Sequence, residues 1–214
     1  MEKVITLPIG DISLDGNLSL PAGACGLVIF VHGSGSGRLS PRNRYVASVL
    51  QETGLATILF DLLTSREEAI DSITGELRFN IGFLAGRLMM VTDWVSRNKD
   101  TRRLNIGYFG ASTGAAAALV AAAERGPAVK AVVSRGGRPD LAGDSLMRVE
   151  APVLLIVGSL DTEVIELNRQ ALARLVTTKE LSIVPGATHL FEEPGTLPQA
   201  ARLAAAWFSS YLKC

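Results

Sequence analysis

Short apolar runs alternate along most of the chain with longer stretches whose apolar residues recur at helical intervals. The apolar runs are short and often end in glycine, as buried strands do, and they cover residues 27–32, 56–63, 104–110, 129–137, 151–159 and 180–186. The intervening stretches predict helices over residues 40–54, 76–98, 112–126, 164–176 and 197–212. Strand–helix alternation of this kind predicts an α/β protein with a mostly parallel sheet and helices on both faces.

The first residues of the chain follow a different pattern. In "KVITLPIGDISLDGNLSL", apolar and polar residues alternate around Asp15-Gly16, which predicts a β-hairpin that turns at this dipeptide. Residues 62–76 are polar and weakly patterned, so we expect a loop over the functional edge of the sheet. The chain has no internal repeat and no linker, which favours a single domain over residues 1–214.

Composition narrows the class of protein. Hydrophobic residues make up 48% of the 214 residues, and 21 basic residues balance 21 acidic ones, so no bulk charge favours nucleic acid. The first residues lack the apolar core of a signal peptide, and no apolar run is long enough to span a bilayer. The cysteines, Cys25 and Cys214, form no metal-like cluster or disulfide framework, and we expect Cys25 to be a buried, reduced thiol. These features indicate a cytoplasmic protein without a membrane partner.

A candidate nucleophile stands where a predicted strand meets a helix. The pentapeptide "GASTG", residues 110–114, follows the strand "LNIGYF" and opens an alanine-rich helix. A nucleophile elbow requires this setting, with small residues on either side of the exposed serine. Ser112 is therefore the candidate nucleophile. The alternative is a plain serine N-cap of the helix.

A serine hydroxyl needs a base, and the chain offers only His32 and His189. His189 follows the last predicted strand, whereas His32 precedes the glycine-rich loop and is expected to tie loop backbone together. Asp161 follows the strand before His189 and would orient it, with Glu163 as the nearest rival. Weaker candidates for the acid are Asp140 and Asp144, together with the expected solvent-facing pair Glu192 and Glu193.

With these segments, the chain resembles the α/β-hydrolase superfamily, and within it the dienelactone hydrolase-like group. The resemblance covers nearly the whole chain, through "LVIFVHGSGSG", "GYFGASTGAAAALVAA", "LLIVGSLDTEV" and "VPGATHLFEEPG". It implies an eight-stranded sheet without an inserted lid domain, with Ser112 as nucleophile, Asp161 as acid and His189 as base. The hydrolases that name the group have cysteine at the elbow, so Ser112 puts a dienelactone substrate in doubt. Similar chains also occur fused to phosphoribosyltransferase domains, of which this sequence contains nothing.

These residues together predict a serine hydrolase that cleaves an ester, thioester or lactone through an acyl-enzyme. We expect the backbone N–H groups of Ser34 and Thr113 to bind the oxyanion. The chemistry requires no metal or organic cofactor, and the partner is a small-molecule substrate. The sequence leaves open whether the protein is a monomer or a homodimer.

Two other readings of the sequence remain as alternatives. A dinucleotide-dependent oxidoreductase would use "VHGSGSG" for phosphates and Asp61 for the ribose, but the spacing is G-x-G-x-G and Pro41 starts the helix late. A P-loop is not expected either, because Gly37 is followed by Arg38-Leu39 and not by the Lys-Ser/Thr pair that a P-loop requires. A non-catalytic binding module on a hydrolase fold is the second alternative.

Arginines collect near the same predicted sheet edge. Arg38, Arg135 and Arg138 are candidate ligands of an anionic substrate, since the planar guanidinium suits carboxylate or phosphate. The alternative is that these arginines form ion pairs with loop carboxylates such as Asp61 and Asp140. Further arginines near this edge are Arg42, Arg44 and Arg78.

Overall fold

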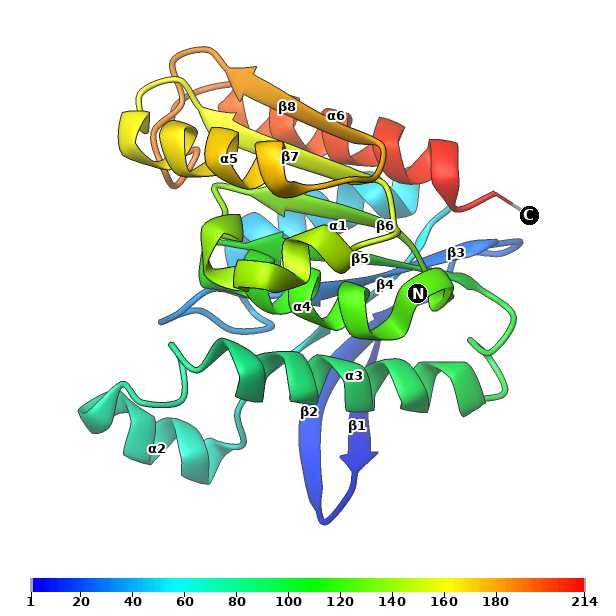
Figure 1. The fold of residues 1–214 in the computed structure, drawn as a ribbon. Helices are drawn as coiled ribbons and strands as arrows, with labels where there is room; N and C mark the ends of the chain where they lie inside the picture. Colours follow the sequence, from blue (N-terminus) through cyan, green and yellow to red (C-terminus); the bar gives the residue numbers. More distant parts are fainter. Residues whose placement is uncertain (1, 214) are drawn as a thin grey trace.

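The computed structural model describes residues 2–213 and is built on one eight-stranded sheet in the order β1-β2-β4-β3-β5-β6-β7-β8 (Figure 1). The strands are β1 (Glu2–Ile9), β2 (Ile12–Ser19), β3 (Gly26–Val31), β4 (Ala56–Phe60), β5 (Asn105–Ala111), β6 (Val129–Arg135), β7 (Val153–Gly158) and β8 (Lys179–Val184). β2 pairs antiparallel with β1 and β4, and β3 to β8 are parallel. The predicted α/β-hydrolase fold is confirmed, and the connection from β6 to β7 holds only the 3₁₀ segment Pro139–Arg148 instead of a lid domain.

Helices cover both faces of the sheet. These are α1 (Pro41–Glu52), α3 (Ile81–Arg97), α4 (Thr113–Arg125), α5 (Thr162–Arg174) and α6 (Thr196–Tyr211), whereas α2 (Ser65–Thr74) lies away from the sheet (Figure 1). α1 and α6 pack together over one hydrophobic core, and α3, α4 and α5 cover the other, as Figure 1 shows. In β3, Val28 and Phe30 enter the first core while Leu27 and Ile29 enter the second. Burial on both faces explains why the sequences of β3, β4 and β7 are nearly uninterrupted apolar runs.

The N-terminal hairpin turns at a different place from the one predicted. Gly10 and Asp11 form the turn, with Gly10 at φ 58°, and Asp15-Gly16 lies inside β2 opposite Thr6 and Ile5. Both dipeptides fit a two-residue turn. The turn at Gly10 keeps Leu7 and Leu14 opposite each other and buried, so side-chain burial set the register.

Residues 65–74 form a helix, α2, instead of the expected loop (Figure 1). Thr64 caps the helix: its hydroxyl accepts the backbone N–H of Glu67, and the Glu67 carboxylate accepts the N–H of Thr64. This reciprocal capping box was present in the sequence as Thr-x-x-Glu. The helix ends at Gly75, which has φ 68°.

Cys25 is half-buried and disulfide-bonded, so the expected reduced thiol was wrong. Cys25 lies just before β3, where its carbonyl accepts the N–H of Asn105. The Asn105 amide in turn donates to the carbonyl of Lys213, so the end of α6 is close to the start of β3. Cys214 lies outside the described residues. The start of β3 and the end of α6 are brought together through Asn105, at the start of the neighbouring strand β5. Their separation in sequence did not reveal this.

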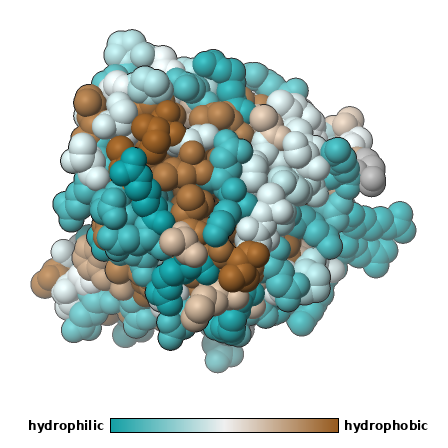
Figure 2. Space-filling model, turned by 45° about the horizontal axis from the view of Figure 1, so that its top comes forward, coloured by the Kyte–Doolittle hydropathy of each residue, from teal (hydrophilic) through white to brown (hydrophobic). Residues whose placement is uncertain are grey.

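Hydrophobic residues on the face shown in Figure 2 gather in several groups with hydrophilic residues between them. Scattered exposed apolar side chains are normal on a protein surface. Within residues 2–213, no helix combines the length and apolarity needed to cross a membrane.

Candidate active site

The carboxyl ends of three parallel strands carry the residues singled out for nucleophilic chemistry. Ser112 directly follows β5, Asp161 follows β7, and His189 follows β8. His189 Nδ1 lies 2.6 Å from Asp161 Oδ2. Ser112 and His189 line the same cavity of about 230 Å³. The structure therefore brings all three to one edge of the sheet.

Ser112 has an unusual backbone conformation, with φ 50° and ψ −126°. Its N–H donates to the carbonyl of Arg135 at the end of β6, and its carbonyl accepts the N–H groups of Ala115 and Arg138 at 3.1 Å each. Positive φ is costly for a residue with a Cβ and persists where surrounding bonds fix it. Two strands and a helix therefore hold Ser112 at the sheet edge.

Two glycines make this elbow possible. A Cβ on Gly110 would collide with the Ala115 backbone, and one on Gly114 would collide with the carbonyls of Val31 and His32. The first collision lies between β5 and α4, and the second lies between α4 and the end of β3. The close approach of helix and strands therefore depends on both glycines.

The loop that carries His189 is held on both sides. Glu193 accepts the N–H and the hydroxyl of Thr188, and these hydrogen bonds lower the pKa of Glu193. Phe191 is buried and has φ 56°, so the turn after His189 is strained as well. The sequence placed Glu193 in solvent. Glu193 is only five residues from Thr188 in the sequence, but no local pattern distinguished Glu193 from Glu192 as the residue that binds Thr188.

Asp161 is free to serve His189 because its side chain does not cap α5, although Asp161 stands at the N-cap position. His189 bonds to Asp161 and not to its rival Glu163. The weaker candidates for the acid are engaged elsewhere, in Asp140–Arg138, Asp144–Arg174 and Glu192–Arg42 ion pairs.

The glycine-rich loop reaches the candidate nucleophile, Ser112. A Cβ on Gly33 would lie 2.9 Å from the Cβ of Ser112, so glycine lets this loop approach. The Ser34 N–H, expected to face an oxyanion, donates to the Thr113 hydroxyl at 3.1 Å. Asp61 accepts the backbone N–H of Arg38 at 2.7 Å, so the carboxylate that a ribose would need already holds the loop.

His32 ties two loops together, as expected. Its Nε2 accepts the N–H of Leu62 at 3.0 Å, which leaves the proton on Nδ1, 3.0 Å from the carbonyl of Gly33. Burial lowers the pKa of His32 below the ordinary value of 6.5. His32 is thus a neutral structural residue beside the site.

The candidate anion-binding arginines have different surroundings. Arg38 pairs with Asp61, and Arg138 pairs with Asp140, as expected if these arginines serve loop ion pairs and not substrate binding. Only Arg135 of these three lines the cavity with Ser112. The other arginines near this edge form ion pairs, which are Arg42–Glu192, Arg44–Glu2 and Arg78–Asp71.

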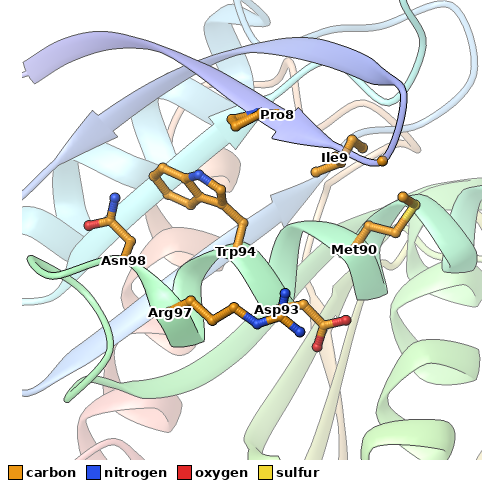
Figure 3. Close-up of a pocket in the computed structure, with 8 residues that line it drawn as sticks. Pro8, Ile9, Met90, Asp93, Trp94, Arg97 and Asn98 are labelled. Carbon is orange, nitrogen blue, oxygen red and sulfur yellow. The ribbon is translucent and has the colours of Figure 1, made fainter.

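A larger hollow, of about 320 Å³, lies between the β1–β2 hairpin and α3 (Figure 3). Figure 3 shows Met90 and Trp94 on α3 facing Pro8 and Ile9 of the hairpin. The lining residues include no serine, cysteine or histidine. The hollow with Ser112 and His189 is therefore the candidate active site, although it is smaller.

The sheet order and the nucleophile elbow define an α/β hydrolase. The chain belongs to the dienelactone hydrolase family, whose model matches residues 42–212. It is similar to the crystal structure of a dienelactone hydrolase from Anabaena variabilis, with 59% sequence identity and a TM-score of 0.98 over 100% of this chain and 99% of that one.

Two further comparisons differ in what they cover. Mycobacterium tuberculosis proteins of two strains, both named "Putative phosphoribosyl transferase", are 54% identical over 211 residues, 99% of this chain. The chain spans 47% of their length, about half. Est1E from Butyrivibrio proteoclasticus has a TM-score of 0.80 at 17% identity, over 97% of this chain and 98% of that one, which shows the shared fold.

Gly114→Ala tests the close packing behind the elbow. The added Cβ would overlap the Val31 and His32 carbonyls, and backbone cannot move aside as a side chain can. We expect a loss of about 3 kcal/mol or more in the free energy of unfolding, measured by urea denaturation. The control is Gly86→Ala in α3, where a Cβ meets nothing within 4 Å and should stabilise by about 0.5–1 kcal/mol. Equal effects of the two substitutions would contradict the packing argument.

His32 predicts a pH dependence of stability. Its pKa is lower in the folded than in the unfolded chain, so the unfolded chain binds more protons below about pH 6.5. The contribution of neutral His32 to the free energy of unfolding is therefore fully present at neutral pH. It falls on acidification, by at most about 1.4 kcal/mol per pH unit. Urea denaturation from pH 7.5 to 5.5 measures the slope. We expect His32→Gln to have a flatter slope than the wild-type protein. An unchanged slope in His32→Gln would refute the assignment.

Proposed function

We propose that this protein is a serine hydrolase that cleaves an ester, thioester or lactone, with Ser112, His189 and Asp161 as its catalytic residues. The supporting observation is the 2.6 Å contact between Asp161 and His189. His189 in turn lines the same cavity as Ser112, whose backbone is strained. Family membership supports hydrolysis as the class of reaction. The proposal adds the nucleophile and the acyl-enzyme.

His189 acts as the proton carrier. Its Nδ1–H donates to Asp161, so Nε2 accepts the Ser112 proton as the hydroxyl oxygen bonds to the acyl carbon. The bond to the leaving oxygen or sulfur then breaks, and that atom takes the proton from His189. Water repeats the sequence: His189 removes one proton, the hydroxide adds to the acyl carbon, and the carboxylic acid leaves as Ser112 regains its proton.

Backbone N–H groups stabilise the charge on the carbonyl oxygen in the intermediates. Thr113 begins α4, where the first N–H groups have no partner within the helix. The Ser34 N–H is held by the Thr113 hydroxyl, which fixes the glycine-rich loop next to α4. We propose that this hydrogen bond sets the position of the loop before substrate arrives, so that Ser34 needs only a small shift to reach the oxyanion.

The name of the Mycobacterium relatives describes proteins of which this chain spans 47%. We propose that the matched part of those proteins is a hydrolase like this chain. A dienelactone substrate is not part of the proposal, because the residue at the elbow is Ser112.

A fluorophosphonate probe tests the nucleophile. We expect one covalent adduct on the wild-type protein and none on Ser112→Ala, because the probe reacts with an activated serine. Intact mass spectrometry measures the adduct, and Ser48→Ala, on the exposed side of α1, is the control that should still react. An adduct that persists on Ser112→Ala would disprove the nucleophile. A wild-type protein that takes no adduct and cleaves no p-nitrophenyl ester, thioester or lactone would favour the binding-module alternative.

Thr113→Val tests the loop contact while keeping the shape of the side chain. Loss of the hydroxyl leaves the Ser34 N–H without its acceptor, so kcat should fall about tenfold, the equivalent of about 1.4 kcal/mol, with little change in KM. Thr113→Ser should retain the activity. Steady-state kinetics on a p-nitrophenyl ester measures the effect, and thermal denaturation checks that both variants are folded. A Val variant as fast as wild type would show that the contact does not support catalysis.

A further inference from the structure

Arg135 is a buried cation without an anionic partner. It ends β6 and is 7% exposed. Its Nη2 donates to the Asn43 side-chain oxygen at 3.3 Å, while Nη1 is buried without a hydrogen-bond partner. Within the described residues, no carboxylate oxygen lies within 4.0 Å of its guanidinium. Burying an unpaired charge is costly, so this position has to be explained by something other than stability.

The neighbouring groups do not compensate the charge. The rings of Phe109 and Phe191 lie 5.8 Å and 6.0 Å from the guanidinium carbon, near the limit of a cation–π contact. Burial, together with a smaller effect of the Arg42 charge, lowers the pKa of Arg135 to about 10. Arg135 therefore remains a cation at neutral pH and lies in a repulsive field.

The cavity beside Arg135 is suited to an anion. Its lining includes Ser40 and Arg42 from the start of α1, together with Asn43, and contains no aspartate or glutamate. A helix N-terminus favours negative charge through its unpaired N–H groups and its dipole. Arg42 shares its charge with the exposed Glu192, whereas Arg135 shares its charge with no carboxylate of the described chain.

We infer that this cavity binds an oxyanion group carried by the substrate, a carboxylate or a phosphate, with Arg135 as its counter-ion. A guanidinium can hold either group through two parallel N–H···O bonds, and Nη1 has the free hydrogen-bonding capacity for one. The inference rests on the proposed function in one respect: Ser112 lines the same cavity, so the anion belongs to the molecule that is cleaved. Arg38 and Arg138 are not part of this site, because Asp61 and Asp140 neutralise them.

Binding is tested without turnover on the Ser112→Ala protein. Inorganic phosphate and benzoate are titrated separately by calorimetry in a chloride buffer. We expect at least one of them to bind, and Arg135→Gln in the same background to weaken that binding at least tenfold. Arg44→Gln is the matched control: it removes an arginine of α1 that pairs with Glu2 outside the cavity, and it should bind as Ser112→Ala does. No binding of either anion, or binding that Arg135→Gln leaves unchanged, would overturn the inference.

Thermal denaturation gives a second readout for Arg135. Without an added anion, Arg135→Met should melt about 2–4 °C above wild type, because it replaces an uncompensated charge with an apolar chain of similar length. Phosphate or benzoate, whichever binds, should raise the melting temperature of wild type and not that of Arg135→Met. A large loss of stability in Arg135→Met would mean that the guanidinium serves the fold, which would count against the inference.

Activity distinguishes the source of the anion. The wild-type protein is assayed on 4-acetoxybenzoate, 4-acetoxyphenyl phosphate and the neutral 4-acetoxybenzamide, and on monophenyl terephthalate against its amide, which places the charge on the acyl side. We expect kcat/KM for at least one anionic ester to exceed that for the neutral one at least tenfold, and Arg135→Gln to abolish the preference. Hydrolysis without any preference would leave the proposed function intact and overturn the anion site. Anion binding that depends on Arg135 without hydrolysis of any ester would do the reverse.

Discussion

The positive-φ backbone of Ser112 is the constraint on which the rest of the site depends. Besides the Ala115 N–H of α4, it is held by β6, which lies beside β5 and supplies the Arg135 carbonyl, and by the segment after β6, which supplies the Arg138 N–H. The same arrangement fixes where the Arg135 side chain begins, since its own carbonyl is the acceptor. The pairing of β5 with β6 therefore positions both the candidate nucleophile Ser112 and the unpaired cation Arg135. A change in the β5–β6 register would move both.

Much of the fold could be predicted from sequence because its signals are local and redundant. The runs that became β3 to β7 are buried on both faces, and their apolar character does not depend on which strands lie beside them. The hairpin turn failed for the opposite reason. Gly10-Asp11 and Asp15-Gly16 both allow a turn, and only the burial of Leu7 opposite Leu14 decides between them. α2 was missed although its capping box was visible, because a weak apolar pattern outweighed a correct terminal signal.

The candidate site divides in the same way. Ser112, Asp161 and His189 could be proposed from residue type and from their position at strand ends, because parallel strands deliver those ends to one edge. The arginines could not be sorted by that reasoning. Arg38 and Arg138 look like Arg135 in sequence, and their neutralisation depends on where Asp61 and Asp140 fold. Whether a charge is paired is a property of three-dimensional contact, so the absence of a partner at Arg135 was visible only in the structure.

An uncompensated cation beside the candidate nucleophile also affects the chemistry itself. In the proposed reaction, negative charge develops on the acyl oxygen while positive charge develops on His189. The guanidinium of Arg135 would favour the first change and oppose the second, since both occur beside the same small cavity. In that reaction the carboxylate of Asp161, 2.6 Å from His189, would stabilise the cation on His189 locally. A bound substrate oxyanion would neutralise Arg135 before the proton moves, so recognition of an anion and proton transfer to His189 would support each other.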